Sequence, residues 1–160
     1  MDKAEGAMES ERVVDVGIRL RMRGEERRIT VQHERLDGLC REVYIQIEKH
    51  GPGRIVGDYL LFMAVLEAHM KIEEEIYFPA LHGLRADAGS ELEDLIVEHL
   101  VLGEEALEVR DLLKANDRAG ARVMLDRFAR RLARHEAAEE DLIARITEGP
   151  VSDFGHSSLC

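Results

Sequence analysis

Four segments of the chain repeat their apolar residues with the period of an α-helix, and glycine or proline residues separate them. We expect these helices over residues 30–49, 54–81, 90–116 and 118–148. The breaks between them are short, so consecutive helices should lie side by side and run antiparallel. The pattern predicts an all-α protein whose main domain, residues 30–148, is an up-down-up-down four-helix bundle.

The two ends of the chain do not share this pattern. Between Val14 and Arg23 apolar and polar residues alternate, which is the period of a β-strand. A lone strand has nothing to pair with in a helical protein, so we expect residues 1–29 to form an extended N-terminal arm. Residues 149–160 follow Gly149-Pro150 and are expected to form a short C-terminal tail. The arm could join two copies in a homodimer, and the tail could bind a protein partner.

Charge and composition exclude several classes of function. The 160 residues include 33 acidic and 22 basic side chains, which gives a formal net charge of −11. Such an acidic chain would repel nucleic acid and anionic membrane surfaces. No apolar stretch reaches the roughly 18 residues of a membrane span. Two cysteines form no disulfide framework and no secretory signal is visible, so we expect a cytoplasmic protein.

Each predicted helix has one histidine in the middle of its apolar stripe, and these are His33, His69, His99 and His135. Glu73 and Glu139 follow two of them by four residues, on the same helix face. Buried ionised carboxylates are costly unless they are paired or bound to a cation. The four histidines and two glutamates are therefore candidate metal ligands that converge on the bundle axis.

The donor set indicates the kind of metal. Mixed imidazole and carboxylate ligation suits iron or manganese better than a structural thiolate zinc site, although zinc remains compatible with it. Two carboxylates that bridge and four imidazoles describe a dinuclear centre whose open positions take solvent, O2 or peroxide. Asp37 follows His33 by four residues and could serve as an additional ligand or as a hydrogen-bond acceptor for a ligand.

At these residues the chain resembles the hemerythrin-like family, also called the HHE cation-binding domain. The resemblance covers about residues 30–148 and rests on His33, the string His69-Met70-Lys71-Ile72-Glu73, His99, and the string His135-Glu136-Ala137-Ala138-Glu139. It implies a non-haem di-iron centre. In such a centre Glu73 and Glu139 bridge two iron ions together with an oxo or hydroxo group, and the four histidines are terminal ligands.

The chain departs from the oxygen-carrying members of that family in two places. Their third helix has a second histidine four residues after the first, where this chain has Gly103. Their fourth helix has an aspartate five residues after the histidine, where this chain offers Glu140, which could serve as an additional ligand or as a hydrogen-bond partner of a ligand. The missing imidazole argues against reversible O2 carriage and favours open-site reactivity. A tyrosine could supply a ligand opposite Gly103, or it could simply pack in the core, and the candidates are Tyr44, Tyr59 and Tyr77.

The resemblance implies a protein that interacts with O2, NO or peroxide in oxygen, redox or iron sensing or binding. An alternative is an enzyme that decomposes peroxide or reduces NO, and another is storage or delivery of iron for the repair of iron centres. Apolar neighbours would keep water away from such a site. The expected pocket lining is Phe62, Leu66, Leu102, Gly103, Phe128 and Leu132.

Overall fold

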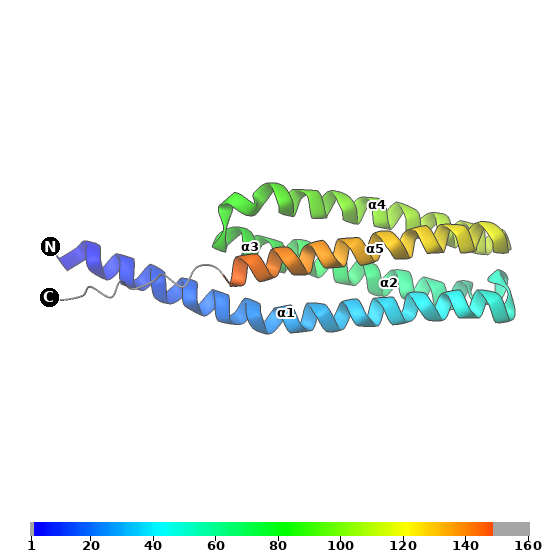
Figure 1. Cartoon of the computed structure of the whole chain (residues 1–160), viewed down its shortest axis with the longest axis horizontal. Coiled ribbons are helices and arrows are strands. Elements are labelled where there is room, and N and C mark those ends of the chain that lie inside the picture. The colour runs from blue at the N-terminus through cyan, green and yellow to red at the C-terminus, as the bar shows by residue number, and fades with distance from the viewer. Residues whose placement is uncertain (1, 149–160) are drawn as a thin grey trace, which may run out of the picture.

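The computed structural model describes residues 2–148, with the surroundings of side chains at residues 17 and 20–148, and consists of four antiparallel helical rods (Figure 1). Three rods are single helices, and the second rod is built from two helices joined by a π-helical turn. The elements are α1 (Asp2–His50), η1 (Pro52–Arg54), α2 (Val56–Ile72), η2 (Glu73–Tyr77), α3 (Phe78–Leu84), η3 (Ala86–Ala88), α4 (Gly89–Lys114) and α5 (Arg118–Thr147).

The rods pack as the sequence predicted. α1 lies against α2 and α5, and α4 lies against the same two helices. Gly51 ends α1 with a φ of 81°, a left-handed conformation that glycine adopts without steric cost. Asp117 begins α5, since its side chain accepts a hydrogen bond from the Gly120 N–H at 2.9 Å. The all-α, up-down-up-down bundle is confirmed.

The conformation expected for the N-terminal arm is wrong. Residues 2–29 are helical and continue directly into the bundle as the first part of α1, which extends past the ends of the other helices (Figure 1). The alternating residues Val14, Ile18 and Met22 are also spaced four apart, which satisfies a helical period equally well. No proline precedes Pro52, so nothing interrupts the helix. The expected C-terminal tail, residues 149–160, lies outside the described residues.

The second rod changes its register at η2, which begins with Glu73, the last residue of the string His69-Met70-Lys71-Ile72-Glu73. A regular α-helix would continue the buried stripe from Glu73 to Ile76, but Ile76 is 59% exposed and Tyr77 is buried instead. A π-helical turn contains one extra residue, so it rotates the following chain by one position. The core face of α3 therefore begins at Tyr77 and Phe78 and continues to Leu81.

Ser90 and Glu93 have the sequence spacing of a helix-capping box, but they do not form one. α4 starts one residue earlier, at Gly89, directly after the 3-10 turn η3, and no side chain caps its first turn. The preceding turn already sets the direction of the chain, because the Ala88 N–H donates to the Arg85 carbonyl at 3.1 Å. Apart from the start of α1, the other predicted helix ends lie within a few residues of the observed ones.

Two apolar clusters fill the bundle and leave a polar layer between them. The larger cluster runs from Leu36 on α1 to Leu132 on α5 and occupies the end of the bundle near Gly51. The smaller one surrounds Leu81 and Ile143 at the opposite end. All four histidines of the motif fall between the two clusters in sequence and are buried. Among the described helices, none combines the length and the apolar character needed to cross a bilayer.

Candidate metal centre

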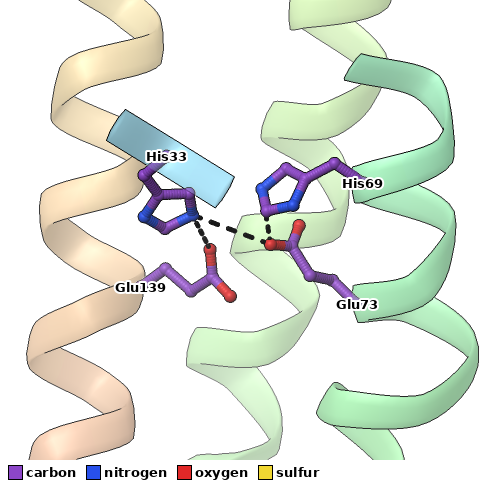
Figure 2. Close-up of side chains that lie close together, drawn as sticks. All are labelled: His33, His69, Glu73 and Glu139. Carbon is purple, nitrogen blue, oxygen red and sulfur yellow. Dashed lines mark ion pairs between the residues drawn. The ribbon is translucent and has the colours of Figure 1, made fainter. Parts of the chain in front are cut away.

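The polar layer brings together the residues that the sequence proposed as ligands, in two groups. The first group comprises His33, His69, Glu73 and Glu139 (Figure 2). His69 Nε2 lies 2.7 Å from Glu73 Oε1, and His33 Nε2 lies 3.3 Å from Glu139 Oε2. One donor atom from each residue lies within 4.8 Å of every other, which is the spacing of atoms that share one ion. These four side chains come from α1, α2, η2 and α5.

The second group comprises Glu73, His99 and His135. The Nε2 atoms of the two histidines are 3.0 Å apart, and Glu73 Oε2 lies 3.3 Å from His99 Nε2. Glu73 thus directs one oxygen to each group, which is the arrangement of a carboxylate between two cations. Glu139 belongs to the first group. The two groups differ in size, with four donors in one and three in the other.

The donor atoms of the centre fit a metal because protein groups leave them unsatisfied. Both carboxylate oxygens of Glu73 and of Glu139 are buried without a hydrogen-bond partner, and so are the Nε2 atoms of His33 and His69. Buried polar atoms are nearly always satisfied in native proteins. Several buried acceptors that point at one another and have no other partner therefore indicate a cation-binding site, and the chemistry of the set suits a first-row transition metal.

Each of the four histidines forms a hydrogen bond, on the side of the ring away from the centre, with a side-chain oxygen of a neighbouring helix. In every case Nδ1–H donates outward, which leaves Nε2 free to bind a metal. The pairs are His69 to Gln32 at 2.9 Å, His99 to Glu74 at 2.7 Å, His135 to Glu98 at 3.1 Å and His33 to Glu140 at 2.9 Å. Since the acceptors come from α1, η2, α4 and α5 in turn, the four bonds form a closed ring around the bundle.

Three of these acceptors, Gln32, Glu74 and Glu98, were missed from the sequence, while Glu140 was proposed as a ligand or as a partner of one. The sequence does contain a pattern that could have identified these acceptors. Each acceptor is the immediate sequence neighbour of a ligand, on the side of the helix that turns toward the adjacent rod. Glu140 takes the second of its two proposed roles, since its contact is to Nδ1 of His33 and not to the donor atoms of the centre.

Burial and mutual contacts shift the pKa values of the residues in the centre. Burial by itself lowers the pKa of His33, but contacts with Glu139, Glu73 and Glu140 outweigh it and raise the pKa to about 11. Burial by itself raises the pKa of Glu73, but the surrounding histidines hold it far below its usual range. For Glu139 burial dominates and the pKa is raised. The cluster therefore attracts positive charge, and a metal ion would displace these protons.

Other residues that the sequence proposed as ligands do not belong to either group. Asp37 is exposed on α1. The three tyrosine hydroxyls are used elsewhere. Tyr59 donates to the Ala106 carbonyl at 2.9 Å, Tyr77 donates to Glu25 at 3.0 Å, and Tyr44 accepts from Arg122 at 3.1 Å.

The apolar residues expected to line the centre are all in the core. Phe62, Leu66, Leu102, Phe128 and Leu132 are each at most 2% exposed and form part of the larger apolar cluster beside the centre. Gly103 lies elsewhere, in a groove of about 290 Å³ between α2 and α4. A Cβ atom at Gly103 would meet open space, so this position does not face the centre.

One buried carboxyl group near the centre was not anticipated. Glu136 follows His135 on α5, is 6% exposed, and leaves its Oε1 without a hydrogen-bond partner. Burial raises the pKa of Glu136 to about 8, and the nearby carboxylates of Asp37, Glu140 and Glu139 act in the same direction against the positive charge of His33. At neutral pH this group is mostly a protonated acid. Glu136 had no separate signal in the sequence, because this residue lies inside the string His135-Glu136-Ala137-Ala138-Glu139.

An antiparallel four-helix bundle with a buried layer of imidazole and carboxylate donors defines a metal-binding helical bundle. Comparison with protein families supports this class, since the family model of the hemerythrin HHE cation-binding domain matches residues 26–146. The match spans well over half of the chain, and the chain belongs to that family. Searches of curated proteins and of solved structures gave no significant match.

Proposed function

We propose that the chain binds two iron ions at the centre and uses them to bind a small oxygen or nitrogen ligand, namely O2, NO or peroxide, in sensing or reversible binding. The observation that carries this proposal is the division of the donors into two adjacent groups that share Glu73. A single ion would not need seven donor positions, whereas two ions joined by a carboxylate use them all. Membership in a cation-binding family supports the same conclusion.

Iron suits this set because imidazole and carboxylate ligands stabilise both its ferrous and its ferric states, and iron in these states supplies redox chemistry and open positions for small ligands. The protein residues prepare the site for that chemistry. The ring of Nδ1 hydrogen bonds fixes the tautomer and the direction of each histidine. The two apolar clusters exclude bulk water from both ends of the polar layer.

A second candidate function is catalytic decomposition of peroxide. The observation that favours it is the inequality of the two groups, since Glu73, His99 and His135 provide only three donors to one ion. An ion held by three protein ligands keeps more positions for exchangeable molecules than one held by four. Glu136 is a buried acid close to the same layer and could supply a proton.

Metal analysis combined with optical spectroscopy tests the proposal. We expect two iron ions per chain, and spectra of the anaerobically reduced protein that change on addition of O2, NO or peroxide. A spectrum restored by removal of the gas supports binding or sensing, whereas rapid loss of added peroxide supports the enzyme. A chain that takes up zinc alone and rejects iron under reducing conditions would overturn the proposal.

Variants of the shared carboxylate test which residues hold the ions. Glu73→Gln keeps the size of the side chain but removes the charge that faces both groups, so we expect it to lose most of the bound metal. Glu105→Gln is the matched control, because Glu105 is a buried glutamate of α4 that contacts Arg127 and Arg131 instead of the centre. Full loading of the Glu73→Gln variant would contradict the assignment.

A further inference from the structure

A groove between α1 and α2 leads from the surface to one ligand of the centre. Its volume is about 330 Å³, and His69 forms part of its lining. The rest of the lining is mainly apolar, with Gln32 and the exposed Arg35 as its other polar residues. Its apolar members are Leu36, Ala64, Val65, Ala68 and Ile72. Liquid water occupies about 30 Å³ per molecule, so the groove admits a diatomic molecule without displacement of any side chain.

Gln32, which accepts the hydrogen bond of His69, lies in the same groove. It is the uncharged acceptor among the four in the ring of hydrogen bonds. Gln32 presents an amide oxygen to His69, whereas the other three histidines donate to carboxylates. Those carboxylates, Glu74, Glu98 and Glu140, are each about 40% exposed to solvent. An ionised carboxylate holds its water far more strongly than an amide does. Among the four acceptors of the ring, the one beside His69 is therefore the least hydrated.

A second groove, between α4 and α5 on the other side of the bundle, has a more acidic lining. The space between α4 and α5 has a volume of about 200 Å³, and three acidic residues, Glu91, Asp94 and Glu98, contribute to its lining, which contains no histidine. An apolar molecule in this groove would have to displace water from these carboxylates, which is unfavourable. The two grooves thus offer a matched comparison within one molecule.

We propose that the groove between α1 and α2 is the path by which a small uncharged diatomic molecule, of the O2 or NO class, reaches the centre on the side of His69. The proposal rests on the metal binding proposed above. Ala64 and Ala68 keep the path open, since both are exposed alanines on the rim of the groove and longer side chains there would fill it. Neither alanine belongs to the ligands or to the apolar clusters.

Ligand association kinetics provide the first test. In the iron-loaded, reduced protein, Ala68→Leu should slow the association of NO by about an order of magnitude, because the leucine obstructs the path. Iron content and melting temperature should stay unchanged. The matched control is Ala138→Leu, the same substitution in the lining of the groove between α4 and α5, which should leave the rate as it is.

Xenon provides a readout that does not depend on the metal. Crystals of the full chain as purified, pressurised with xenon, should show a xenon atom between α1 and α2 beside Ala68 and His69. The Ala68→Leu variant should lose this atom, and Ala138→Leu should retain it. Xenon is an uncharged, apolar probe of the size of a small gas molecule, so it occupies sites that O2 or NO would occupy.

Two results would overturn the proposal, namely an unchanged NO rate in Ala68→Leu or an equal slowing in Ala138→Leu. Xenon bound elsewhere, with none between α1 and α2, would contradict it as well. Failure of the proposed function looks different, because the wild-type chain would then hold no iron that binds NO. In that case the xenon position still decides whether the groove admits such a molecule.

Discussion

At the scale of single residues, the centre combines a carboxylate that neighbouring histidines keep ionised with a carboxyl group that burial keeps protonated. Glu73 stays ionised because histidines surround it, whereas Glu136, one residue after His135, is held as an acid by burial. Burial lowers the pKa of His135 to about 4, and the positive charge of His99 acts in the same direction. The same layer therefore contains glutamates and histidines in both protonation states, and local contacts decide which state each adopts.

Glu136→Gln should make the metal-free protein more stable at alkaline pH and leave it nearly unchanged in acid. The native pKa of about 8 lies above the ordinary value of 4.5, so the native state retains a proton that the unfolded chain loses. Stability of the wild type therefore falls as pH rises from about 4.5 to about 8, and glutamine removes this loss. Urea unfolding of both proteins at about pH 4 and about pH 9 measures the difference.

The exposed Glu108 of α4 supplies the control, since Glu108→Gln should show no such dependence on pH. An equal effect of Glu136→Gln at both pH values would mean that a packing change, and not the proton, determines its stability.

Glu74→Ala should weaken metal binding by about 10–100-fold although Glu74 contacts no ion. Its carboxylate accepts the Nδ1 proton of His99 at 2.7 Å and so fixes the direction of that ligand. Competition with a chelator of known affinity measures the change. Glu75→Ala is the control on the same turn, because Glu75 is 64% exposed and contacts only Lys71 at the surface. Equal losses in both variants would refute the positioning role of Glu74.

At the scale of elements, most of the fold followed from the helical period and the breaks, and the exceptions have physical causes. The spacing of His33, His69, His99 and His135 was enough to place four imidazoles in one layer. The turn at η2 could not be read, because an extra residue in a helix leaves no mark in local composition. The acceptors of the ring were missed since they are partly exposed, and only their position next to a proposed ligand distinguishes them from surface residues.

Deleting Glu75 from η2 should be tolerated far better than deleting Glu67 from α2. The π-helical turn contains one surplus residue, so its removal converts the turn to α-helix and keeps Tyr77 on the core face. Loss of Glu67 would instead rotate every preceding residue of α2 by about 100° against the ligands. We expect melting temperatures within roughly 8 °C of the wild type for the first deletion and no cooperative transition for the second. Circular dichroism with thermal melting measures both.

At the scale of the whole molecule, the two halves of the bundle carry the same set of polar residues. His33 and His99, His69 and His135, Glu73 and Glu139, and Glu74 and Glu140 are each 66 residues apart. Gln32 and Glu98 have the same spacing and differ in charge. Each half thus supplies two histidines, one buried glutamate and two acceptors, and the acceptor of every histidine comes from the neighbouring rod. Neither half holds the complete donor set of either group.

Metal loading should stabilise the whole bundle and release protons. Because the ions bind the folded centre and not the unfolded chain, a free metal concentration of about 100 times the dissociation constant adds about 2.7 kcal/mol to the stability. His33, whose raised pKa of about 11 keeps it protonated without metal, must lose its proton to bind. The gain in stability should therefore shrink as pH falls. Calorimetric titration in buffers of different ionisation enthalpy counts the protons, and a proton count of zero would contradict the assigned ligation.

The closed ring of four hydrogen bonds also determines how the bundle can come apart. Each rod donates from its histidine to one neighbour and accepts from the histidine of the other, so withdrawing any one rod at this level breaks two bonds and removes at least one donor from the centre. The ends of the rods have no such linkage and can fray separately. The middle of the molecule should therefore behave as one cooperative unit, in which the amide protons of all four rods become accessible to exchange only when the whole domain unfolds.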